Sequence, residues 1–173
     1  SLLINSKLSN CFSVIFPAIQ YTSVFILIVS HRFIKIKHIF RKNVRFFDIL
    51  NKNVKYTILT TNPIFPYNGT LTRMDFINLK ENDFDYITAY ENSSYCKPNP
   101  QYFSEILKKF NLKAENVILF GNNTLEDAYC ASKLGIKTYL VGDYIIDKQN
   151  IINKYDHIKM EDIIPTIKKH LEY

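Results

Sequence analysis

The clearest indication of the fold comes from ILFGNNTLED, residues 118–127. An apolar run at residues 117–120 ends at Gly121, and two asparagines separate this glycine from a helix start that carries Glu126 and Asp127. Glycine permits a tight exit from a strand, and acidic residues in a first helical turn complement the helix dipole. In open parallel sheets, ligands bind beyond the carboxyl ends of the strands. The segment therefore predicts a strand, a polar turn at a binding edge, and a helix.

The same alternation of strands and helices extends through most of the chain. Thr70 is a predicted N-cap, and Gly135 is a predicted residue just past a helix end. The alternation predicts an α/β fold, a Rossmann-like three-layer sandwich with a mostly parallel sheet and helices on both faces. The predicted strands cover residues 24–29, 56–60, 86–89, 117–120 and 137–141, and the predicted helices cover residues 36–52, 70–80, 100–110, 125–134 and 161–171.

The charge is unevenly distributed. The 173-residue chain has a net charge of +6, but the residues before Asp48 include seven Lys or Arg and no acid. From Asp48 onward, 15 basic side chains face 16 acidic ones. The folded part is therefore near neutral, which disfavours nucleic-acid binding. Three cysteines without metal-ligand spacing favour reduced thiols in a cytoplasmic protein.

The N-terminal segment, residues 1–35, is apolar and basic and forms an atypical region ahead of a core domain at residues 36–173. Residues 11–30 carry no charged side chain, and twenty such residues could span a bilayer. Alternatively, VFILIV at 24–29 is a buried strand that replaces a missing central strand. The first residue is Ser and not Met. We therefore expect an incomplete or rearranged gene product, and we rank a membrane anchor last among the alternatives.

Polar residues at two further strand ends suggest a phosphate site. In TILTTN, residues 57–62, the hydroxyl of Thr61 and the backbone near Asn62 could hold phosphate oxygens. In CKPNP, residues 96–100, Pro98 and Pro100 follow Lys97 and stiffen the backbone around it, and the Lys97 ammonium would stabilise phosphoryl charge. Taken singly, each segment is better explained as an ordinary turn. Their order on successive strand ends favours a shared site.

These three segments resemble the second, third and fourth motifs of the haloacid dehalogenase-like hydrolase superfamily, over about residues 40–173. Most members are Mg²⁺-dependent phosphatases. The resemblance implies catalytic and phosphate-binding roles for three residues and a metal-binding role for three others. The implied phosphate-binding residues are Thr61, Asn62 and Lys97, and Thr61 and Lys97 are also the implied catalytic residues. The implied metal-binding residues are Asp127, Asn122 and Asn123.

Two departures from the family pattern bear on activity. The opening Asp-x-Asp-Gly-Thr motif, which supplies the nucleophile, is absent, and no carboxylate precedes Asp48. Asn122 and Asn123 stand where relatives place an acid after Gly121. We therefore expect Mg²⁺ to be held weakly or lost, and phosphomonoester hydrolysis to be impaired. The alternative is a non-catalytic phosphate-binding or scaffold domain, with or without a membrane tether.

The usual cap domain between the first two motifs is not found, so the chain is expected to be a truncated core. The resemblance implies a small phosphorylated molecule as the partner. It does not imply which molecule, because the cap selects substrates in this superfamily.

Overall fold

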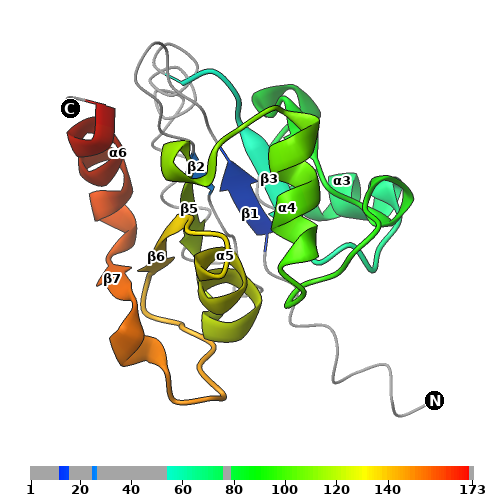
Figure 1. Cartoon of the computed structure of the whole chain (residues 1–173). Coiled ribbons are helices and arrows are strands. Elements are labelled where there is room, and N and C mark those ends of the chain that lie inside the picture. Colours follow the sequence, from blue (N-terminus) through cyan, green and yellow to red (C-terminus); the bar gives the residue numbers. More distant parts are fainter. Residues whose placement is uncertain (1–11, 16–24, 27–53, 76–78, 172–173) are drawn as a thin grey trace.

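The computed structural model describes residues 12–15, 25–26, 54–75 and 79–171. Its strands form two sheets, one with the order β1-β3-β4 and one with the order β2-β5-β6-β7 (Figure 1). The strands are β1 (Phe12–Ile15), β2 (Phe25–Ile26), β3 (Ile58–Thr61), β4 (Tyr86–Ile87), β5 (Ile118–Gly121), β6 (Lys137–Val141) and β7 (Asp156–Ile158).

The strand pairs are mostly parallel, as predicted. β3 pairs with β4, β2 with β5, β5 with β6, and β6 with β7, all in parallel. Only β1 runs antiparallel to its neighbour among the described strands, with Phe12 opposite Thr61 and Ile15 opposite Ile58. Neither this strand nor the division into two sheets was predicted, because the uncharged run at 11–30 shows no alternation that would fix a strand or its direction. Of the predicted strand at 24–29, residues 25–26 are described, and they pair with β5.

Helices cover both faces of the strands. The main helices are α3 (Tyr67–Asp75), α4 (Gln101–Lys109), α5 (Cys130–Ser132) and α6 (Ile163–Leu171). Leu59 of β3 packs in one core cluster with Met74 of α3 and Ile167 of α6. Its neighbour Ile58 packs in a second cluster with Phe103 of α4 and with α5. Successive side chains of a strand point to opposite faces, so this division confirms the three-layer arrangement.

The start of α3 differs from the prediction. The helix begins at Tyr67, and Thr70 lies buried inside it, so the prediction of Thr70 as the N-cap is wrong. The Glu91 carboxylate accepts the Tyr67 N–H at 3.0 and 2.8 Å and takes the capping role from another part of the chain. A long-range cap of this kind leaves no local sequence signal.

Other elements follow the predictions with local changes. The helix predicted at 125–134 is a π-helical turn, Thr124–Tyr129, that runs into α5, and Gly135 has the predicted left-handed conformation with φ +78°. β7 was not predicted, because its short segment is polar and largely exposed. The helix predicted at 36–52 lies outside the described residues.

Within the described ranges, no helix is both long enough and apolar enough to cross a membrane. Of the predicted candidate span at 11–30, the structure describes residues 12–15 and 25–26, which are strands.

The buried aromatic Phe120 provides a test of the core. Its ring stacks on Tyr139 with centroids 5.7 Å apart, and Phe120 is 0% exposed. We expect Phe120→Ala to lower the free energy of unfolding by about 3–5 kcal/mol, because it removes apolar contacts and leaves a cavity. Urea denaturation measures the loss. Ile64→Ala, at a side chain that is 41% exposed, is the matched control and should change stability by less than about 1 kcal/mol.

Candidate functional site

Lys97 and Asp127 form a buried ion pair where the segments after β4 and β5 meet. The Lys97 ammonium lies 2.8 Å from Asp127 Oδ1, and both side chains are 0% exposed. Lys97 also donates to the Thr60 hydroxyl at 3.2 Å. The rings of Tyr102 and Phe103 lie 5.5 and 5.4 Å from the ammonium. A charge in so apolar a setting requires a partner, and Asp127 supplies it.

The two threonines at the end of β3 have different surroundings. Thr60, which the sequence interpretation did not single out, contacts Lys97. The Thr61 hydroxyl instead donates to the carbonyl of Thr88 at 2.8 Å, and the Thr61 N–H donates to the Thr88 hydroxyl at 2.7 Å. Tyr102 donates to the Thr61 carbonyl at 2.7 Å. Successive side chains of a strand point to opposite faces, so Thr60 and Thr61 must have different surroundings. The sequence could have assigned them only if the face of one of the two residues were known.

The turn after β5 is fixed by hydrogen bonds of its own side chains. The Asn123 N–H donates to Asp127 Oδ2 at 3.0 Å. Asn123 Oδ1 accepts the N–H groups of Leu125 and Glu126, both at 3.0 Å, and so caps the helical turn. Asn122 Nδ2 donates to the Tyr144 carbonyl at 3.2 Å, which anchors the segment after β6. The structure thus brings Asn123, Asp127 and Lys97 together, while Asn122 is directed to a different loop.

A family model for the haloacid dehalogenase-like hydrolases matches residues 4–141 of this sequence. The chain belongs to this family. The match begins well before residue 40, where the resemblance of the three motifs starts, so it includes the N-terminal segment that the sequence interpretation set apart.

Curated relatives of the haloacid dehalogenase-like chain cover short parts of it. A glyceraldehyde 3-phosphate phosphatase from Pyrococcus furiosus is 34% identical over 55 residues, which are 32% of this chain and 23% of that protein. The haloacid dehalogenase-like hydrolase domain-containing protein 3 of Danio rerio is 27% identical over 88 residues, 50% of this chain and 36% of that protein. The chain therefore matches about a quarter to a third of the length of these relatives.

A solved structure supports the fold of this family member. A protein assigned as a beta-phosphoglucomutase from Thermotoga maritima aligns with a TM-score of 0.54 at 22% identity, over 83% of this chain and 62% of that chain.

The predicted metal residues of this family member do not make a dedicated cation site. Both Asp127 oxygens are engaged, one by Lys97 and one by the Asn123 N–H, and Asn123 Oδ1 caps the helix. In the described part of the chain, no group of three or more His, Cys, Asp or Glu is placed to hold a metal ion. Mg²⁺ prefers near-octahedral oxygen coordination that includes carboxylates, and these atoms are already used within the chain.

Glu126 was interpreted from the sequence only as a helix-dipole acid, but it lies beside the ion pair. Burial, together with the negative charge of Asp127, raises the pKa of Glu126 to about 7, although Lys97, Lys148 and a hydrogen bond with Asn62 act in the opposite direction. Glu126 Oε2 and Asn62 Oδ1 are both buried without a hydrogen-bond partner. Burying such oxygens costs free energy, so each of these two side chains has one unsatisfied acceptor atom at this edge.

The ion pair predicts a specific pattern of stability. Lys97→Met should lower the free energy of unfolding by about 3–5 kcal/mol, because it leaves Asp127 charged and buried without its partner. The double variant Lys97→Met/Asp127→Asn removes both charges and keeps an acceptor for the Asn123 N–H, so it should be more stable than the single variant. Guanidinium denaturation of both proteins compares them. A double variant as unstable as the single one would show that the charge pair is not the source of the effect.

Glu126 predicts a pH dependence with a defined sign. Its pKa is near 7 in the folded protein and near 4.5 when unfolded, so the folded state binds its proton more tightly. Stability from this group is full below pH 4.5 and falls as the pH rises through 7, by at most about 3 kcal/mol. Urea denaturation at pH 5 and pH 8 measures the slope, and Glu126→Gln should flatten it. Glu115→Gln, at an exposed residue, should leave the slope unchanged.

Proposed function

We propose that this haloacid dehalogenase-like chain binds the phosphate group of a small phosphorylated molecule at the Lys97 site and does not hydrolyse it. The observation that carries the proposal is the buried Lys97 ammonium, held 2.8 Å from Asp127 and 3.2 Å from the Thr60 hydroxyl at the end of β3. Membership of a phosphatase family favours a phosphate monoester over other anions. The names of the Pyrococcus relatives suggest a phosphorylated three-carbon sugar as the first ligand to test.

Charge and hydrogen bonding explain how the site would hold an anion. An ammonium ion surrounded by apolar rings interacts strongly with a phosphate oxygen, since little water screens it. Asp127 both orients Lys97 and competes with the anion for it, so we expect binding to be weak. Thr61 and Asn62, at the end of β3, are the proposed further phosphate ligands, and Thr61 would have to release its hydrogen bonds with Thr88 to bind. Their roles follow from the family motif and from their position next to Thr60.

The absence of turnover follows from the residues that the sequence supplies. Covalent phosphoryl transfer needs a nucleophile, and no carboxylate precedes Asp48. Loss of a covalent nucleophile costs several orders of magnitude in rate in other hydrolases. With Asn122 and Asn123 in place of acids and Asp127 paired with Lys97, we propose that Mg²⁺ binds weakly and contributes little. The free thiols of Cys96 and Cys130 support a cytoplasmic location.

Titration calorimetry and a hydrolysis assay test the two halves of this proposal. Inorganic phosphate and glyceraldehyde 3-phosphate should bind the full chain, with or without Mg²⁺. The Lys97→Met/Asp127→Asn variant should bind about tenfold or more weakly, because a charge-assisted hydrogen bond contributes about 1.5–3 kcal/mol. A panel of phosphomonoesters with Mg²⁺ should give no turnover above background.

Two results would contradict the proposal separately. Phosphate affinity that is equal in the chain and in the double variant would exclude Lys97 as the anion site. Turnover that disappears in Lys97→Ala would mean that the chain contains a nucleophile outside the family position.

A further inference from the structure

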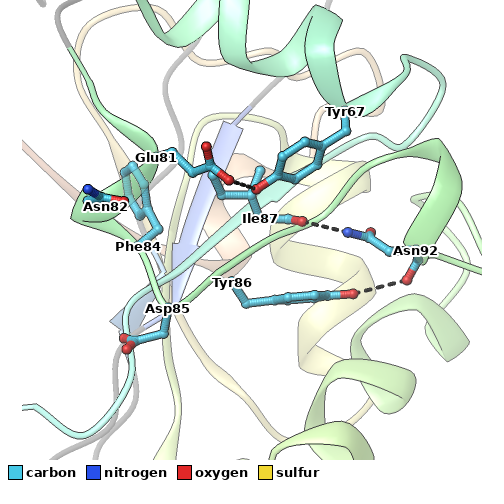
Figure 2. Close-up of a pocket in the computed structure, with 8 residues that line it drawn as sticks. All are labelled: Tyr67, Glu81, Asn82, Phe84, Asp85, Tyr86, Ile87 and Asn92. Atoms are coloured by element: carbon cyan, nitrogen blue, oxygen red, sulfur yellow. Dashed lines mark hydrogen bonds between the residues drawn. The ribbon is translucent and has the colours of Figure 1, made fainter.

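A pocket lies away from the Lys97 site, between the start of α3, the turn at Glu81–Asp83 and strand β4 (Figure 2). Its volume is about 440 Å³, within the range of about 300–1,000 Å³ found for small-molecule sites. None of its lining residues belongs to the phosphate site. The side chains that matter to its chemistry are Tyr67, Glu81, Phe84, Asp85, Tyr86 and Asn92.

The pocket carries two carboxylates, Glu81 and Asp85, that lack a salt bridge among the described residues. The Tyr67 hydroxyl donates to Glu81 Oε1 at 2.8 Å, and Figure 2 shows Glu81 directed toward this ring. Asp85, further along the pocket, accepts the Thr57 N–H. Burial and the hydrogen bond to Glu81 raise the pKa of Tyr67 to about 12, so Tyr67 stays a neutral donor.

The aromatic rings of the pocket are suited to a cation, and its walls are fixed. The Lys109 ammonium lies 4.7 Å from the centroid of the Tyr86 ring, so this ring is already occupied by a cation of the chain, and the ring of Tyr67 is the one left for a ligand. The Tyr86 hydroxyl donates to the Asn92 carbonyl at 3.0 Å, and Asn92 Nδ2 donates to the Ile87 carbonyl at 2.8 Å (Figure 2). Glu91 accepts the Tyr67 N–H and so fixes the backbone of this lining residue.

We propose that this pocket binds a small organic cation with an ammonium or guanidinium group, which contacts the Glu81 carboxylate and the ring of Tyr67. No lining residue is cationic, and the carboxylates of Glu81 and Asp85 would repel an anion. A bare divalent ion would find carboxylates already committed to Tyr67 and to the Thr57 N–H, and aromatic rings where it needs oxygens. Organic cations gain both from carboxylates and from aromatic faces.

Titration calorimetry of the full chain with putrescine and with guanidinium chloride tests this inference. Both cations should bind at low ionic strength, and butane-1,4-diol, the neutral counterpart of putrescine, should not. Glu81→Gln keeps the acceptor for the Tyr67 hydroxyl and removes the charge, so it should weaken binding by about threefold or more. Asp85→Asn should weaken binding less, because Asp85 lies further along the pocket.

Matched variants make each outcome decisive. Glu115→Gln removes one exposed acid elsewhere on the surface, where Glu115 pairs only with Lys113 at 3.6 Å, and it should leave the affinity unchanged. Thermal unfolding establishes that each variant is folded. Absence of binding to the unmodified chain overturns the proposal, as does equal weakening by Glu81→Gln and Glu115→Gln, which would indicate general charge attraction. The Lys97→Met/Asp127→Asn variant should bind putrescine normally, which separates this pocket from the phosphate site.

Discussion

The buried ion pair between Lys97 and Asp127 is the constraint on which the rest of the site depends. It joins the segment that precedes α4 to the helical turn after β5 and brings the end of β3 alongside through the Thr60 hydroxyl. Two opposite charges that are both fully buried must stay together, because either one alone would face a large desolvation penalty. The positions of Asn123 and Glu126 follow from this pairing, since both belong to the turn that presents Asp127.

The charge balance at this strand edge also sets the chemistry. In the family pattern, several acids at the strand ends hold a cation, and an attacking carboxylate stands opposite the phosphorus. Here neutral asparagines occupy positions 122 and 123, and the remaining acid, Asp127, is paired with Lys97. The charged groups that organise this edge are therefore the Lys97 ammonium and its counter-ion, the Asp127 carboxylate. The proposal of anion binding without hydrolysis rests on this balance of charge.

Much of this arrangement was predictable from the sequence. The motif order placed Lys97 and Asp127 after successive strands of the chain, and the alternation of apolar segments predicted helices on both faces. The different surroundings of Thr60 and Thr61 were not predictable, because they depend on which face of β3 turns toward α4. The unpartnered oxygens of Asn62 and Glu126 result from tertiary packing between distant segments. β1 and β7 were missed because one lies in an uncharged run without alternation and the other is polar.

A crystal structure of the full chain grown with tungstate, a heavy anion similar in shape to phosphate, tests the central claim most directly. The account predicts an anomalous peak within hydrogen-bonding distance of Lys97 Nζ, with Asp127 and Thr60 still beside the ammonium. A peak at another surface, or a Lys97 side chain that extends into solvent away from Asp127, would contradict it.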